Sequence, residues 1–139
     1  MKWRRYIRKN GRRGSSMAEA AITLPAIVLL TFAMVNLSMA WYAAVAASNA
    51  ANFGARMGSV AQSDPQGHAV AAAQTRLAST SIGTYSITAT GGGTRGSQIV
   101  VSIDWTVPNY ITGLMTLLGG GGPASFSGTV ISTVRQEGW

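Results

Sequence analysis

The longest pattern in the chain is a run of apolar residues near its N-terminal end. No charged residue lies between Glu19 and Arg56, and residues 20–45 are almost wholly apolar, with Asn36 and Ser38 as the strongly polar interruptions. A membrane-spanning helix needs roughly 20 such residues, and a helix over residues 20–45 would reach about 39 Å. The pattern predicts a membrane-inserted helix, because the remaining chain is too short to surround a buried core helix of this length.

The pattern changes after Val60. Residues 63–67 include aspartate, proline and glycine and predict a break, and the alanine-rich residues 68–80 predict a short second helix. Apolar and polar residues then alternate, which is typical of strands with one buried face. The predicted strands are residues 85–90, 101–107 and 126–134. The sequence thus predicts an α+β fold, in which a long N-terminal transmembrane helix precedes a short helix and a small antiparallel β-sheet of three or four strands.

The region after the second helix is small for an independent hydrophobic core. We therefore expect the C-terminal part of the long helix to bury Ile103, Trp105 and Val130. Residues 110–118 form an apolar connection and predict a short helix with partly exposed side chains. Two interpretations of this patch are open, a contact with another subunit or a loop folded over the open end of the sheet. Its apolar residues are Ile111, Leu114, Met115, Leu117 and Leu118.

Positive charge is concentrated at the N-terminus and changes the picture. The chain has 11 Lys and Arg residues against 4 Asp and Glu residues, a formal net charge of +7. All of the excess precedes Gly14, and the rest of the chain is formally neutral. A basic cluster beside a membrane span places that end in the cytoplasm and the remaining chain outside the cytoplasmic membrane. This position favours a topology signal over a nucleic-acid-binding arm, so we expect no nucleic-acid partner.

Candidates for catalysis or metal binding are few. The chain has no cysteine and one histidine, His68, and nothing in the spacing of Asp64, Asp104 and Glu137 suggests a carboxylate pair. The glycine runs at 91–93 and 119–122 indicate flexible loops and not a phosphate-binding loop. We therefore expect no enzymatic activity, no cofactor and no metal site.

Three interpretations of the N-terminus compete. The first is a signal anchor that keeps its basic end. The second is a secretory signal peptide cleaved after Ala40 or Ala46, where small residues alternate suitably, which would release a soluble binding domain. The apolar run exceeds the roughly 7–15 residues usual in such signals. The third is cleavage between Gly14 and Ser15, before the apolar run.

The third interpretation is supported by a resemblance. Residues 12–30, RRGSSMAEAAITLPAIVLL, resemble the processing site of type IV pilin-like precursors, in which a basic leader ends in glycine and a glutamate occupies the fifth mature position. Residues 14–58 are similar to the TadE-like minor pilins, or pseudopilins, of tight-adherence (Tad/Flp) pili. The matching motifs, in order, are Ala18-Glu19, Leu24-Pro25, Trp41-Tyr42-Ala43, Asn49-Ala50-Ala51 and Gly54-Ala55-Arg56. One departure is Asn52-Phe53, where relatives often carry Arg-Glu.

The resemblance implies an organisation and a role. Residues 1–14 would be a basic leader, residues 15–60 a membrane-spanning and filament-core helix, and residues 61–139 a small extracytoplasmic α+β domain. A prepilin peptidase would cut between Gly14 and Ser15. The implied partners are this peptidase, other pilin subunits, the pilus assembly machinery and membrane lipid. The protein would begin as a single-pass protein of the cytoplasmic (inner) membrane and then move into a pilus.

Glu19 has two interpretations that can hold together. Residues 16–19 fit the S-x-x-E capping box of a helix start, and an acid suits the positive end of the helix dipole. The resemblance implies instead that Glu19 meets the new α-amino group of Ser15 on a neighbouring subunit. A carboxylate at the membrane edge is costly without such a partner.

Other residues of the long helix are candidates for packing or assembly. Pro25 removes a helix hydrogen bond and would favour a kink. Asn36 would hydrogen-bond either a partner helix or its own backbone. Gly54 and Gly58 form a G-x-x-x-G pair, a signal for close helix packing. Their position beside Arg56 favours ordinary packing over a membrane-embedded contact.

Overall fold

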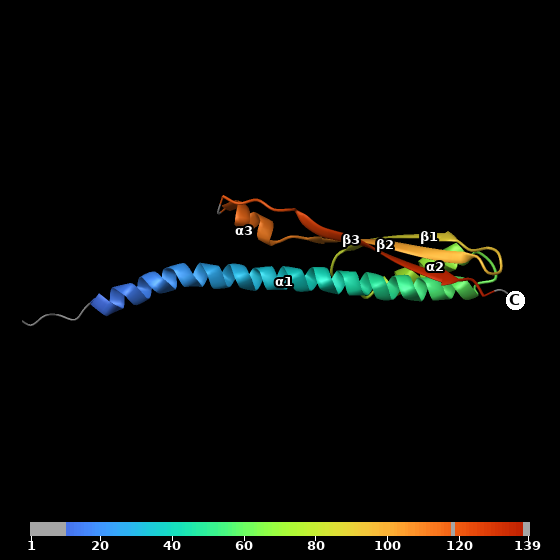
Figure 1. The fold of residues 1–139 in the computed structure, drawn as a ribbon, viewed down its shortest axis with the longest axis horizontal. Coiled ribbons are helices and arrows are strands. Elements are labelled where there is room, and N and C mark those ends of the chain that lie inside the picture. Colours follow the sequence, from blue (N-terminus) through green and yellow to red (C-terminus); the bar gives the residue numbers. More distant parts are fainter. Residues whose placement is uncertain (1–10, 118, 138–139) are drawn as a thin grey trace, which may run out of the picture.

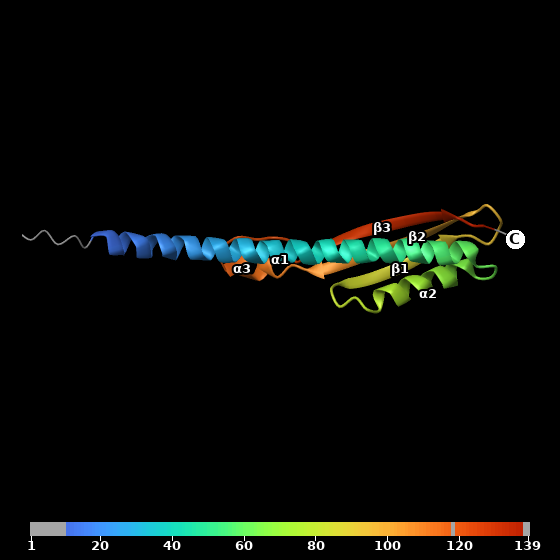
Figure 2. The same cartoon turned by 90° about the horizontal axis from the view of Figure 1, so that it is seen from below.

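A computed structural model describes residues 11–117 and 119–137 of the chain. One long helix, α1 (Gly11–Val60), extends along the molecule, α2 and the three strands pack on its C-terminal half, and α3 lies further toward its N-terminal end (Figures 1 and 2). At 1.5 Å per residue its 50 residues reach about 75 Å. The predicted α+β fold, with a long apolar helix, a short helix and a small antiparallel sheet, is confirmed.

Helix α1 begins earlier than the sequence pattern predicted. Its first residue is Gly11, so Ser16 lies inside the helix and not at its start. The expected capping box of residues 16–19 is therefore wrong for the full chain, because the N–H groups at these positions belong to a continuing helix. The predicted leader, residues 1–14, overlaps α1 at its last residues, and residues 1–10 lie outside the described part of the chain.

Helix α2 (Pro65–Leu77) turns back along the end of α1 (Figure 2). It begins before the predicted residue 68 because Asp64 caps it: the carboxylate accepts a hydrogen bond from the Gly67 N–H (3.0 Å), and Asp64 has a left-handed backbone with φ 45°. Pro65 then takes the first helical position, where its missing N–H costs nothing. The helix ends at Leu77, three positions before the predicted end.

The sheet has three antiparallel strands in the order β1-β2-β3. They are β1 (Thr84–Gly91), β2 (Gln98–Pro108) and β3 (Ser125–Arg135). The register places Ile87 opposite Ile103 and Ile103 opposite Val130. All three predicted strands are confirmed, each extended by one to three residues at its ends.

The core lies between the sheet and the C-terminal half of α1. Ile99, Val101 and Ile103 of β2 are fully buried against alanines of α1, including Ala47 and Ala51. Trp105 and Val130 are partly buried against the same cluster. The expectation that α1 covers these strand residues is confirmed. The small helix side chains let the sheet approach the helix closely, so this short region gains the core that it could not build alone.

Between β2 and β3 the chain leaves the sheet and runs back along α1. This segment, residues 109–124, contains the short helix α3 (Ile111–Leu117) and is called the arm below. In both views α3 lies on the side of the sheet toward the N-terminal end of α1 (Figures 1 and 2). The predicted short helix is confirmed, but the alternative of a loop folded over the end of the sheet is wrong.

Candidate functional site

The N-terminal half of α1 is an uncovered apolar surface. Every residue from Ser16 to Val35 is exposed apart from the half-buried Leu29. Over residues 11–117 and 119–137, α1 is the one helix long and apolar enough to cross a membrane. Residues 16–35 span about 30 Å of helix, close to the hydrocarbon thickness of a bilayer. Its large exposed side chains include Ile22, Leu24, Ile27, Leu30, Phe32 and Met34.

The candidate cleavage bond lies in the first turns of this helix. The backbone at Gly14 and Ser15 is helical. Five residues follow before the uncharged run, with Glu19 as the last charged residue until Arg56. The bond between Gly14 and Ser15 thus separates a strongly basic segment from an apolar helix within a single continuous element.

Glu19 and Pro25 are both exposed on the uncovered half. The Glu19 carbonyl accepts a hydrogen bond from the Thr23 hydroxyl (2.7 Å) in addition to its place in the helix. Pro25 lies inside α1, as predicted, and it has no N–H to donate to the carbonyl of Ala21. The N-terminal part of α1 bends relative to the rest of the helix in Figure 1, which is the expected consequence of a proline inside a helix.

Asn36 marks the end of the uncovered half. Its side chain is only 2 % exposed, and its amide is hydrogen-bonded to the side-chain amide of Asn109 at the start of the arm (2.6 Å). Within this chain the partner is therefore the arm and not the backbone of α1, so the predicted bond to its own backbone is wrong. The reason is topological: the chain after β2 returns to α1 at this level.

Asn109 organises the arm. Its Oδ1 also accepts from the Ile111 N–H (3.1 Å), and its Nδ2 donates to the Pro123 carbonyl (3.0 Å). One amide thus joins α1, the first residue of α3 and the far end of the arm. Sequence reasoning missed Asn109, although an asparagine directly after Pro108 and before an apolar helix is a recognisable local cap.

Gly54 and Gly58 pack against α2 of the same chain. A Cβ at Gly54 would lie 2.6 Å from the Ala69 carbonyl oxygen, and a Cβ at Gly58 would lie 2.7 Å from the Pro65 carbonyl oxygen. These glycines are required because the backbones of α1 and α2 nearly touch there. The interpretation of the pair as ordinary helix packing is confirmed.

Two further contacts fix the sheet and α2 to α1, through Asn52 and Phe53 of α1. The Ser132 hydroxyl of β3 donates to Oδ1 of Asn52 (2.8 Å). The Arg76 guanidinium of α2 lies 4.3 Å from the centre of the Phe53 ring, within cation–π range. Asn52 and Phe53 therefore act in folding, and the sequence pattern did not indicate this.

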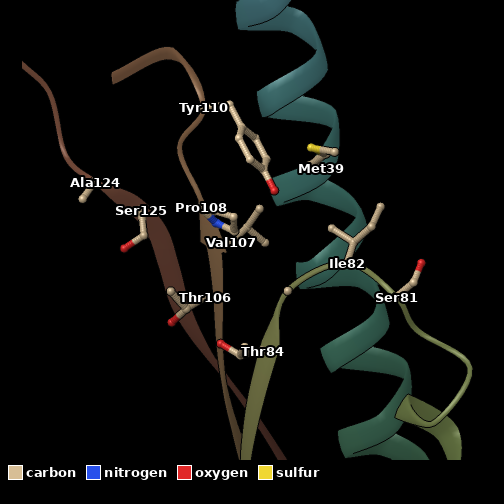
Figure 3. Close-up of a pocket in the computed structure, with 11 residues that line it drawn as sticks. Met39, Ser81, Ile82, Thr84, Thr106, Val107, Pro108, Tyr110, Ala124 and Ser125 are labelled. Atoms are coloured by element: carbon tan, nitrogen blue, oxygen red, sulfur yellow. The ribbon is translucent and has the colours of Figure 1, made fainter. Parts of the chain in front are cut away.

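An apolar cavity of about 390 Å³ lies where the arm leaves the sheet. Figure 3 shows Met39 of α1 and Tyr110 of the arm on one side, with Val107 and Pro108 at the end of β2. Thr84, Thr106 and Ser125 also line it, and no charged side chain does. The lining offers packing surface and hydroxyls but no acid or base pair for catalysis.

Titratable groups are sparse in the described part of the chain. Over residues 11–117 and 119–137 there is no group of three or more His, Cys, Asp or Glu residues that could hold a metal ion. Burial raises the pKa of the Tyr85 hydroxyl, and nearby Tyr42 adds to the rise. This hydroxyl donates to the Ile82 carbonyl (2.8 Å). Tyr85 of β1 therefore has a structural role, because it holds the preceding loop.

Part of α1 matches a known protein family. Residues 14–56 match the family model of the TadE-like proteins. The matched segment begins at Gly14, includes the whole uncovered half of α1 and ends two residues beyond the buried Gly54. The chain matches no curated protein, and no solved structure matches it. The resemblance identified in the sequence is confirmed for this segment.

Proposed function

We propose that this chain, whose residues 14–56 form a TadE-like segment, is a minor pilin (pseudopilin) of a tight-adherence pilus. Helix α1 inserts into the cytoplasmic membrane with the basic N-terminus in the cytoplasm. A prepilin peptidase removes residues 1–14, and the remaining chain takes part in assembly of the pilus. The protein supplies a structural subunit and a peptidase substrate, and it catalyses no reaction itself.

One observation carries the proposal. The TadE-like segment coincides with a helix that is bare and apolar over about one bilayer thickness and then packed against a small domain. A soluble monomer would leave this half in water, and each large apolar side chain left in water forgoes about 1.5–3 kcal/mol. The bare half therefore needs lipid before assembly and other apolar helices afterwards.

The partners follow from this requirement. Other pilin subunits would replace lipid around the bare half of α1, and head-to-tail contacts of that kind can extend into an open filament. The pilus assembly machinery would supply the free energy needed to extract α1 from the membrane. Glu19 would meet the α-amino group that cleavage creates on Ser15 of a neighbouring subunit, which provides the carboxylate with a cation inside an apolar filament.

A secreted domain released by signal peptidase is the competing function. Cleavage after Ala40 or Ala46 would cut α1 inside the part that packs on the sheet, where Ala40, Ala43 and Ala47 are all buried. It would also remove Asn36 from its bond with Asn109. The packing therefore supports a mature chain that keeps α1 from Ser15 to its C-terminal end.

Processing is tested by replacing the glycine at the cleavage site. Gly14→Phe, expressed with the peptidase, should leave precursor of full length in the membrane, because a peptidase site that fits glycine excludes a large side chain. Gly11→Phe is the matched control, since it changes another glycine of the same basic segment and should be processed normally. Immunoblotting of membrane fractions separates the two sizes, and normal processing of Gly14→Phe would refute this cleavage site.

A further inference from the structure

We propose that the arm, residues 109–124, rests in the outer leaflet of the membrane beside α1, at the boundary between acyl chains and head groups. This lipid contact would hold the domain against the bilayer before assembly. The inference deepens the proposed function and rests on its membrane stage, because it requires α1 to be inserted.

The first argument is position. The arm leaves the sheet at Pro108 and continues along α1 toward the N-terminus, and α3 contacts α1 (Figure 1). The Asn36–Asn109 bond fixes the start of the arm beside the last turn of the uncovered half. Leu29, two turns further toward the N-terminus, is half-buried between exposed neighbours. The arm therefore lies beside helix that is long and apolar enough to be in lipid.

The second argument is depth. If the hydrocarbon region holds residues 16–35, Asn36 lies at its outer edge, and α3 lies at or just inside that edge. If the exposed Trp41 and Tyr42 mark the outer interface, as aromatic residues commonly do, Asn36 lies about 7.5 Å inside it. Both placements put α3 at bilayer depth, while the sheet remains outside.

The third argument is surface chemistry. The exposed face of the arm carries Tyr110 (62 % exposed), Met115 and Leu117 (82 % exposed). No charged residue occurs between Asp104 and Arg135. Tyrosine is enriched at membrane interfaces, and exposed aliphatic side chains without a nearby charge can enter the acyl region. Leu118 also belongs to this sequence but lies outside the described residues.

The fourth argument is the hydrogen bonding of the arm. The Asn109 N–H donates to the Ala124 carbonyl, and the Thr112 hydroxyl donates to the Pro123 carbonyl (2.6 Å). The Gly120 N–H donates to the Met115 carbonyl, and the Thr116 hydroxyl donates to the Thr112 carbonyl. Polar groups near lipid must find partners inside the protein. These bonds join the two ends of the arm and satisfy part of its backbone inside the protein.

Site-directed spin labelling tests the proposal, because the chain has no cysteine that would compete for the label. The full chain is reconstituted in vesicles of phosphatidylethanolamine and phosphatidylglycerol. Single variants Leu117→Cys, Ile27→Cys and Thr133→Cys are labelled and exposed to oxygen, which partitions into lipid, and to a nickel chelate, which stays in water. Ile27 reports on the bare half of α1, and the exposed Thr133 reports on β3. Met115→Cys provides a second position on the arm.

The expected result is a ratio of oxygen to nickel accessibility at Leu117 that resembles Ile27 and exceeds Thr133 several-fold. A ratio like that of Thr133, with Ile27 still in lipid, would overturn the lipid contact and leave the proposed function standing. Spectral broadening at Leu117 that disappears on dilution with unlabelled chain would show a second copy on the arm and would also overturn it. Nickel access at Ile27 would instead refute the membrane stage of the proposed function.

Discussion

Asn36 and Asn109 join segments 73 residues apart through their side-chain amides, and the Ser132 hydroxyl and the Asn52 amide join segments 80 residues apart. Each pair supplies a directional contact between α1 and a later element, where the surrounding packing is mostly alanine. A partly buried hydrogen bond of this kind adds about 1 kcal/mol to stability, and its geometry fixes the position of the two segments. These four polar residues therefore decide where the arm and β3 lie along a helix whose apolar surface is otherwise uniform.

Removal of the Asn36 amide should release the arm. Asn36→Ala is expected to cost about 1 kcal/mol locally, which corresponds to roughly fivefold faster hydrogen exchange at the amides of residues 109–117. Ser38→Ala is the control, because the Ser38 hydroxyl donates only to the Met34 carbonyl of its own helix. Hydrogen-exchange mass spectrometry of the full chain in detergent measures both. Equal exchange in the two variants would show that the Asn36–Asn109 bond does not hold the arm.

The contact between α1 and α2 depends on the absence of side chains. Gly54 and Gly58 face Ala69 and Pro65 so closely that a methyl group would overlap backbone oxygen atoms. Backbone atoms cannot move aside as a flexible side chain can, so the cost falls on the helix pair as a whole. The same closeness brings Arg76 over Phe53 and places α2 beside β1.

Gly54→Ala should therefore destabilise the domain by about 1–3 kcal/mol, although alanine favours a helix more than glycine does. Gly113→Ala in α3 is the matched control, because a Cβ there meets nothing within 4 Å, and its stability should stay the same or rise slightly. Urea unfolding of the full chain in mild detergent, followed by tryptophan fluorescence, gives the comparison. Equal stability of the two variants would contradict the close α1–α2 contact.

Local sequence signals predicted the helices and strands closely, but they did not predict which elements contact one another. The alternation of apolar and polar residues predicted β2, and the proline and glycine near position 65 predicted the break before α2. Both signals act over a few residues. The partner of Asn36 and the course of the arm depend on where the chain meets α1 again after β2. The order of apolar and polar residues does not say where that is. The capping box at residues 16–19 failed for a related reason, since a cap requires the helix to begin there.

The two halves of α1 have different surroundings in the whole molecule. The C-terminal half of α1 is covered by the domain, with Ala47, Ala50 and Ala51 fully buried, whereas the N-terminal half is exposed. The net charge of +7 belongs to the residues before Gly14. Cleavage there would leave a formally neutral subunit whose bare helix can exchange lipid for neighbouring subunits. The candidate cleavage site rests on the local order of residues in the sequence, and its use depends on a peptidase.

The most direct test of this account is the intact mass of the subunit in purified pili. Mass spectrometry should find a chain that begins at Ser15 and keeps residues 15–139, because processing after Gly14 precedes assembly. A chain that begins at Trp41 or Ala47 would contradict the account and indicate release by signal peptidase. A subunit of full length, or pili that lack the chain altogether, would equally contradict the role of a processed minor pilin.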